Sequence, residues 1–336
     1  MITDTAARMW PYKFVAWILR TLLLAVPEEM GGGRLNLQTG TAVTGIFRME
    51  QPEDTTLAGN AGSGGGWRVQ TPRGVVTAKK VILATNAYTS ALLPGFKDLI
   101  VPCRGQMSAL LPPETLRGEK RLRRSYGFVG PGQDDYLIQR EQTEGGGGGG
   151  EHLMFGGGRS AGLSLGECDD GVVEKGVARY LRRSLVNLLG LEEEKGGTDS
   201  QITTTGALSN DNEAQEFEAT HEWTGIMGFS RDDLPFVGPV PGHRGLWLSA
   251  GYTGHGMPNA WLCGRAVAGM IFSAFDDHHE RGEKEMEASE KDAIDEAVRH
   301  GLPRAYVLDA ARIDRARKLA TVAEQDAEFM FKAEAA

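Results

Sequence analysis

The stretch from Gly251 to Pro258 reads GYTGHGMP and holds the residue types best suited to ligand chemistry. Its glycines allow positive φ and a close backbone approach to a flat ligand, because no Cβ stands in the way. Pro258 suits the first position of a following helix, and that helix terminus would direct free N–H groups toward the turn. We therefore predict a turn that binds an anion or cofactor. A tight turn in an ordinary α/β domain is the alternative.

Two short apolar runs predict where this turn lies in a fold. Gly245–Ala250 leads directly into the turn, and Lys79–Ala84 ends in Thr85-Asn86-Ala87. Continuous apolar runs of this length are typical of strands buried on both faces, as in the parallel sheet of an α/β domain. Pro258–Phe275 then continues as an apolar helix. The predicted unit is strand, glycine turn and helix.

The N-terminal part combines helix and strand signals. Phe14–Val26 is apolar at helical spacing, which favours a buried or half-buried helix over a signal-peptide core, and it is too short to span a bilayer. Leu35–Phe47 is rich in strand-forming residues, Gln51–Gly66 reads as a loop, and Trp67–Thr71 with Val75–Thr77 reads as a hairpin.

The middle of the chain predicts an antiparallel sheet with a helix. Gln106–Leu111, Asp135–Arg140 and His152–Phe155 are strand-like and are joined by polar loops, one of which contains the low-complexity Gly145–Gly150. Val177–Leu189 has the pattern of an amphipathic helix. We expect an α+β domain on the substrate side of the molecule.

Composition narrows the functional classes. With 336 residues and 40% hydrophobic content the chain can bury a core, and its net charge of −9 argues against nucleic-acid or anionic-membrane surfaces. Cys103, Cys168 and Cys263 are odd in number and too scattered for a disulfide framework, and no pair has the short spacing of a zinc site. These features predict a reducing, cytoplasmic setting and no metal.

Four segments resemble the D-amino-acid oxidase-like family of FAD-dependent oxidoreductases, which includes sarcosine oxidase and glycine oxidase relatives and many fungal members. They are Lys80–Pro94, Val101–Gln106, Trp223–Gly238 and the GYTGHGMPNA run, and they occur in the family's order. The resemblance covers residues 5 to 275. It implies oxidation of a C–N bond of a small amine or amino acid by hydride transfer to flavin.

The resemblance also implies a role for individual residues. Val43 resembles the position whose backbone meets the adenine, and Ala84 to Asn86 resemble the strand end that passes the pyrophosphate and ribose. Gly105 resembles the crossing near the isoalloxazine. Gly225 falls near the position where some relatives carry a cysteine bound covalently to FAD, so the resemblance implies a non-covalent flavin. The full set expected at the cofactor is Val43, Ala84, Thr85, Asn86, Gly105, Gly225, Gly251, Gly254, His255, Gly256 and Met257.

Three residues are candidates for the catalytic site, and one of them, His255, is also in the cofactor set. His255 would lie near the flavin and tune its charge, or be a solvated or turn-bonded histidine. Arg104 would pair with a substrate carboxylate, or form a structural ion pair. Tyr136 would line the substrate pocket, or pack within the sheet. The oligomeric state is left open.

The sequence departs from the family in one respect. The G-x-G-x-x-G unit that holds the FAD pyrophosphate has no convincing match. Gly31–Gly33 lacks the third glycine, and Gly145–Gly150 matches only as low complexity. Gly156 to Ala161 follows a short strand, but no amphipathic helix comes after it. We expect either a fragment or truncated gene product, or a non-catalytic remnant acting as an interaction module. An NAD(P)-dependent dehydrogenase would require the same fingerprint.

The predicted fold class is α/β plus α+β: an incomplete FAD-binding, Rossmann-like domain with an antiparallel-sheet substrate domain inserted. The expected parts are residues 1–100 and 221–275 for FAD binding, 101–220 for substrate binding, and 276–336 as a charged helical tail that wraps the surface.

Overall fold

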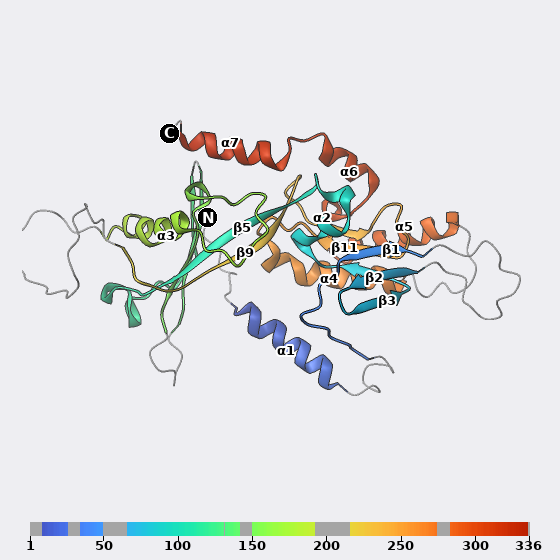
Figure 1. Ribbon diagram of the computed structural model, residues 1–336, viewed down its shortest axis with the longest axis horizontal. Helices are drawn as coiled ribbons and strands as arrows, with labels where there is room; N and C mark the ends of the chain where they lie inside the picture. Colours follow the sequence, from blue (N-terminus) through green and yellow to red (C-terminus); the bar gives the residue numbers. More distant parts are fainter. Residues whose placement is uncertain are drawn as a thin grey trace, which may run out of the picture. The chain divides into compact units, whose positions relative to one another are not determined.

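The computed structural model describes residues 9–25, 34–49, 66–130, 132–141, 150–191, 216–273 and 283–334. The chain forms two compact units, one of Met1–Phe47 with Arg68–Thr77 and one of Arg48–Trp67 with Ala78–Ala336. Figure 1 shows the elements along the chain. The borders expected at residues 100, 220 and 275 stay predictions.

The first unit contains a helix and most of a small sheet. Helix α1 is Pro11–Leu24, and the sheet has the order β1-β2-β3, with β1 at Gly45–Arg48, β2 at Trp67–Thr71 and β3 at Gly74–Ala78. The predicted hairpin is confirmed, with Gly74 at a φ of 135° after its turn. The expectation of a buried or half-buried α1 is wrong for most of its length. None of its residues is buried, and Ile18 and Leu19 are half-buried positions in it.

A parallel strand pair organises the second unit. β10 (Phe236–Pro239), β11 (Leu246–Ala250) and β4 (Val81–Leu83) form a sheet in the order β10-β11-β4, with β11 antiparallel to β10 and parallel to β4. Leu246 pairs with Val81 and Leu248 with Leu83. The strands between β4 and β10 in the chain, β5 to β9, form a separate sheet, which confirms the predicted insertion.

The two strands of the parallel pair differ in burial. All five residues of β11 are buried, as predicted. Ile82 in β4 is 52% exposed, so the expected burial of that strand on both faces is wrong. The reason is position: β4 ends the row of paired strands in the part of the chain that is described.

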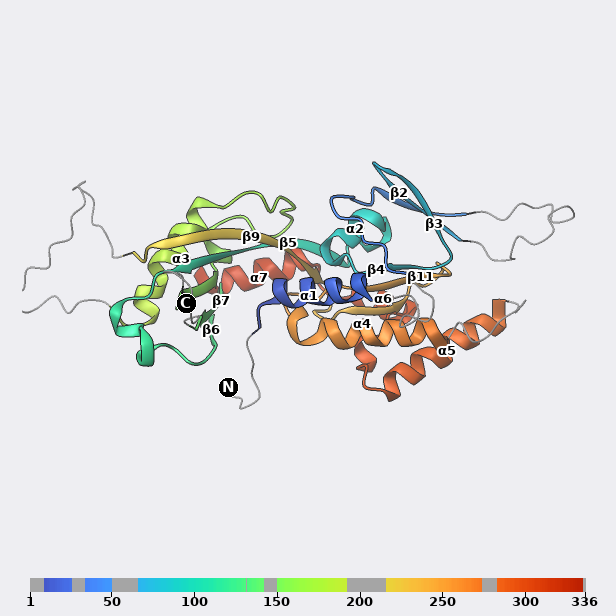
Figure 2. The same cartoon turned by 90° about the horizontal axis from the view of Figure 1, so that it is seen from below.

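The inserted sheet has five strands in the order β6-β7-β8-β5-β9, with antiparallel neighbours throughout. The strands are β5 (Ile100–Leu110), β6 (Tyr126–Gly130), β7 (Gln133–Gln139), β8 (Leu153–Gly157) and β9 (Ala219–Ser230). Helix α3, Lys175–Leu188, packs on one face through Leu181 and Leu185, against Leu137 and Phe155. The predicted combination of antiparallel sheet and helix is confirmed (Figure 2).

The C-terminal region contributes to the core as well as to the surface. Helix α4 (Gly256–Ser273) packs against α5 (Glu283–Arg299), and Val307 forms a bridge with Val237 of β10. α6 (Ala310–Arg317) and α7 (Val322–Glu334) follow. In the described residues no helix is both long and apolar enough to cross a membrane.

Short helices complete the described structure. They are η1 (Asn86–Tyr88), α2 (Thr89–Leu92), η2 (Pro94–Phe96), η3 (Glu114–Leu116), η4 (Gly118–Lys120), η5 (Arg159–Ala161) and η6 (Arg304–Tyr306).

Candidate cofactor and substrate site

The predicted strand end at Asn86 and the predicted glycine turn meet in the structure. β4 and β11 are parallel neighbours, so their carboxyl ends lie at one edge of the sheet, where ligands of α/β proteins bind. Asn86 has a φ of +43°, and its Oδ1 accepts hydrogen bonds from the backbone N–H groups of Gly251 at 3.0 Å and Tyr252 at 3.3 Å. Ala84 and Thr85 connect β4 to this point.

The turn after β11 has the backbone that its glycines predict. Gly251 and Gly254 both have a φ of +78°, and Thr253 between them has a φ of +47°. A Cβ at Gly251 would lie 3.2 Å from the Cβ of Ser230, so both conformation and space favour glycine there. The Thr253 N–H donates to the Gly228 carbonyl at 2.8 Å and fixes the turn against β9.

The turn ends in helix α4, which begins at Gly256 rather than at Pro258 as expected. Pro258 therefore lies within the first turn of the helix, where its missing N–H is still tolerated. Met257 beside it is 58% exposed.

His255 is exposed, and its Nδ1 lies 2.7 Å from the Thr253 carbonyl oxygen. This contact is the turn-bonded arrangement, one of the two alternatives for this residue. The Asp233 carboxyl is its charged neighbour: partial burial raises the pKa of Asp233, Asp232 raises it further, and His255 acts in the opposite direction. A role for His255 at the flavin stays a prediction.

Two of the predicted glycines are direct neighbours in the inserted sheet. Gly105 of β5 is opposite Gly225 in the adjacent strand β9. A Cβ at Gly225 would meet no described atom within 4 Å, whereas one at Gly105 would lie 2.9 Å from Cε of Met227. The Sδ of the same methionine lies 3.7 Å from the position of a Cβ at Gly254. Met227 therefore joins the sheet to the glycine turn.

Met227 was not among the predicted site residues. Its position in the alternating pattern of β9, two residues after Gly225, was the signal that could have identified it.

Arg104 is buried, with 7% of its surface exposed. Its guanidinium donates to the backbone carbonyls of Leu163 and Asp169 and forms an ion pair with Glu167 at 3.5 Å. These contacts support the structural alternative for Arg104, and its pairing with a substrate carboxylate stays a prediction.

Tyr136 lies on β7 with 51% of its surface exposed, and its hydroxyl lies 2.7 Å from Sδ of Met107. Burial of the hydroxyl and the nearby Asp134 carboxylate raise the pKa of Tyr136. Val43 belongs to the other unit, where it is half-buried and immediately precedes Thr44 and β1.

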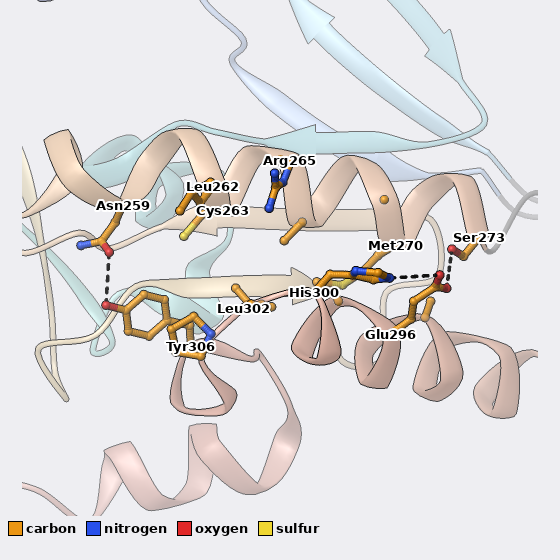
Figure 3. A pocket seen from close by; sticks show the side chains of 16 residues that line it. Asn259, Leu262, Cys263, Arg265, Met270, Ser273, Glu296, His300, Leu302 and Tyr306 are labelled. Atoms are coloured by element: carbon orange, nitrogen blue, oxygen red, sulfur yellow. Dashed lines mark hydrogen bonds and ion pairs between the residues drawn. The ribbon is translucent and has the colours of Figure 1, made fainter.

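A separate cavity of about 580 Å³ lies between α4 and α5. Figure 3 shows its polar ends, where the Tyr306 hydroxyl donates to Asn259 and the Ser273 hydroxyl donates to Glu296. None of the predicted cofactor residues lines it. The cavity is therefore distinct from the site at the strand ends.

Comparison with known sequences identifies the family. Residues 34–270 match the family described as FAD dependent oxidoreductase. The chain belongs to this family.

Among curated relatives in the FAD dependent oxidoreductase family, a glycine oxidase of Pseudomonas putida is 25% identical over 191 residues, which are 56% of this chain and 40% of the relative. A glycine oxidase of Pseudomonas aeruginosa is 24% identical over 210 residues, 60% of this chain and 44% of the relative. The chain thus spans less than half the length of these relatives.

Two solved structures with similarity to the chain are a glycine oxidase and an Amadoriase I. The crystal structure of glycine oxidase from Geobacillus kaustophilus has a TM-score of 0.43 at 20% identity, covering 67% of this chain and 46% of that one. A mutant of Amadoriase I from Aspergillus fumigatus has a TM-score of 0.45 at 14% identity, covering 81% and 53%.

The open backbone at Gly225 is compatible with the flat ring system of the FAD that names the family. No described atom lies within 4 Å of a Cβ built at Gly225, whereas the Met227 side chain covers Gly105 and reaches toward Gly254. A planar group can approach such a surface closely. Gly225 also has no side chain to which a flavin could be attached.

Proposed function

We propose that this chain forms the flavin-facing part of an FAD-dependent oxidoreductase that oxidises a C–N bond of an amine or amino acid. The observation that carries the proposal is the junction of Asn86 with Gly251 and Tyr252, which sets the glycine turn at the carboxyl ends of two parallel strands. Family membership and the glycine oxidase relatives support the same activity. No observation favours the alternative of a non-catalytic interaction module.

Within this proposal, backbone groups of the Gly251–Met257 turn and the start of α4 would hold the negatively charged edge of the flavin. Gly105 and Gly225 would lie against its ring, and Ala84 to Asn86 would lie along the rest of the cofactor. Bound FAD supplies the two-electron acceptor for the oxidation. The chain itself would orient the reactants. The turn would fix the edge of the cofactor, and the substrate would bind against the open face of the inserted sheet.

Retention of FAD tests this function directly. The full chain is mixed with FAD, separated from free cofactor by gel filtration and examined for the visible absorbance of flavin. We expect flavin to co-elute with the protein and to be released on denaturation, because the bond is predicted to be non-covalent. A folded chain that stays colourless would overturn the proposal.

A matched pair of glycine variants sharpens the test. Gly225→Val places a branched side chain in space that is free of described atoms, so the protein should fold and lose flavin. Gly95→Ala, at another position with open space around it, should fold and keep flavin. Equal retention by both variants would place the flavin elsewhere.

A further inference from the structure

A row of side chains crosses the inserted sheet next to the Gly105–Gly225 pair. Tyr136 of β7 is opposite Gly156 of β8, Gly156 is opposite Met107 of β5, and Met107 is opposite Trp223 of β9. Residues directly opposite each other in antiparallel strands project from the same face of a sheet. These four residues, which we call the aromatic row, therefore share one face.

The aromatic row lies on the face that α3 does not cover. Leu137 and Phe155, the neighbours of Tyr136 and Gly156 in sequence, pack in the core beneath α3. Successive side chains of a strand point to opposite faces, so the row points away from that core. Tyr136 is 51% exposed and Trp223 is 40% exposed. Both aromatic side chains thus leave apolar surface on this face of the sheet that a ligand could cover.

The ring of Tyr136 packs over the backbone of Gly156. A Cβ at this position would lie 2.1 Å from Sδ of Met107 and 2.9 Å from Cζ of Tyr136. Only glycine leaves the phenol ring and the thioether room to meet, and their contact is the 2.7 Å approach of the tyrosine hydroxyl to the sulfur. Gly156 is thus a positioning residue for Tyr136.

The aromatic row is next to the expected flavin position. Met107 and Trp223 are each two residues from the paired glycines Gly105 and Gly225, about 7 Å along the strands at the usual rise per residue. Met227 continues the same face to the Gly254 turn. A substrate held against the flavin ring would therefore meet the aromatic row.

Two arginines of the inserted region, Arg159 and Arg104, are already paired. Arg159 binds Asp134 and Asp326 and lies between the rings of Phe229 and Phe329. Arg104 is bound to the loop that contains Glu167. The row itself carries no charge, which favours an apolar group over a carboxylate in contact with it.

We propose that the aromatic row determines specificity by binding an apolar, preferably aromatic, substituent of the amine substrate between Tyr136 and Trp223. This inference rests on the proposed function and names the substrate class for the same site. Flat aromatic groups would be held by ring contacts with Tyr136 and Trp223. Gly156 and Met107 would hold Tyr136 in place for these contacts.

Calorimetric titration with benzylamine and with methylamine tests the inference, using the full chain incubated with FAD. We expect benzylamine to bind at least about fivefold more tightly than methylamine, an advantage of the size that one or two aromatic contacts provide. Tyr136→Ala and Trp223→Ala should each remove most of that advantage. Phe272→Ala, which removes a 70% exposed aromatic side chain from α4 instead of from the sheet, should leave it unchanged.

Equal affinities of the wild-type chain for the two amines would overturn the inference. This comparison needs no variant, so it tests the inference even if an alanine variant fails to fold. An advantage for benzylamine that survives both sheet variants would also overturn it. Flavin absorbance, recorded on the same samples, separates this question from the proposed function. Flavin retained without selectivity refutes the aromatic row alone, whereas selectivity without flavin refutes only the oxidoreductase.

Discussion

The side-chain carboxamide of Asn86 accepts a hydrogen bond from the backbone N–H of Gly251, a residue 165 positions further along the chain. A second bond comes from Tyr252. One polar side chain thus satisfies two backbone donors of the glycine turn and fixes the two halves of the candidate site to each other.

Removal of this carboxamide should weaken both the fold and the site. Asn86→Ala leaves two backbone N–H groups without their acceptor, and we expect a loss of about 1 to 3 kcal/mol in the free energy of unfolding, measured in urea. Asn86→Gly keeps the positive φ while losing the same acceptor. If Asn86→Gly were as stable as wild type, backbone conformation and not hydrogen bonding would explain the asparagine.

Two glycines of β9 should respond differently to the same substitution. A Cβ at Gly228 would lie 2.7 Å from Oδ1 of Asn86 and 2.8 Å from the backbone nitrogen of Ala87. Gly228→Ala should therefore cost about 1 to 3 kcal/mol of stability through overpacking. Gly225→Ala has open space and should change stability by less than about 0.5 kcal/mol. Similar denaturation midpoints for the two variants would contradict this arrangement.

A buried ion pair should matter more than an exposed one. Arg312 is 3% exposed, and its guanidinium binds both carboxylate oxygens of Asp232 and the carbonyls of Leu234, Pro235 and Tyr306. Arg312→Leu leaves a partly buried carboxylate unpaired and should cost about 3 to 5 kcal/mol. The control is Arg317→Leu, which breaks the exposed pair with Asp98 and should cost about 1 kcal/mol or less. Urea denaturation of both variants gives the comparison.

Stability should fall in mild acid because of His152. This residue is 7% exposed, and neither ring nitrogen has a hydrogen-bond partner among the described residues. Burial, followed by Arg140 and His221, lowers the pKa of His152. The unfolded chain then binds a proton at this histidine more readily than the folded one. The contribution of neutral His152 to the free energy of unfolding is therefore fully present above about pH 6.5 and decreases as the pH falls below that value.

The measurement is the urea midpoint of unfolding at pH 8 and pH 5. His152→Leu should reduce the difference between the two midpoints. His300→Gln, which changes an imidazole with 74% of its side chain exposed, should leave the difference as in wild type. A difference that is the same in all three proteins would assign the acid sensitivity to other groups.

The glycine turn and its strand could be predicted from sequence because their signals are local. Leu246–Ala250 is a continuous apolar run and is buried throughout, and Gly251 and Gly254 adopt the positive φ that glycine permits. The antiparallel sheet with its amphipathic helix was predictable for the same reason, since alternation and helical spacing are visible within single segments.

What could not be predicted depends on contacts between distant segments. The apolar pattern of α1 indicates a buried face, but whether a face is covered depends on other parts of the fold. In the sequence, Asp232 is one of two acidic residues before Leu234-Pro235, and only the fold shows that its carboxylate binds Arg312, eighty positions away. Met227 lies at the candidate site because the register of β9 with β5 positions it there.

The insertion of the five-stranded sheet between β4 and β11 has a consequence for the order of folding. β6, β7 and β8 of this sheet pair with neighbours close in sequence, whereas β5 pairs with β9, and β4 with β11, only after a long segment of chain has been closed. Closing a long loop is slow unless its interior is already compact. The Asn86–Gly251 junction should therefore form after the rate-limiting barrier, so that substitutions there accelerate unfolding and leave the refolding rate almost unchanged.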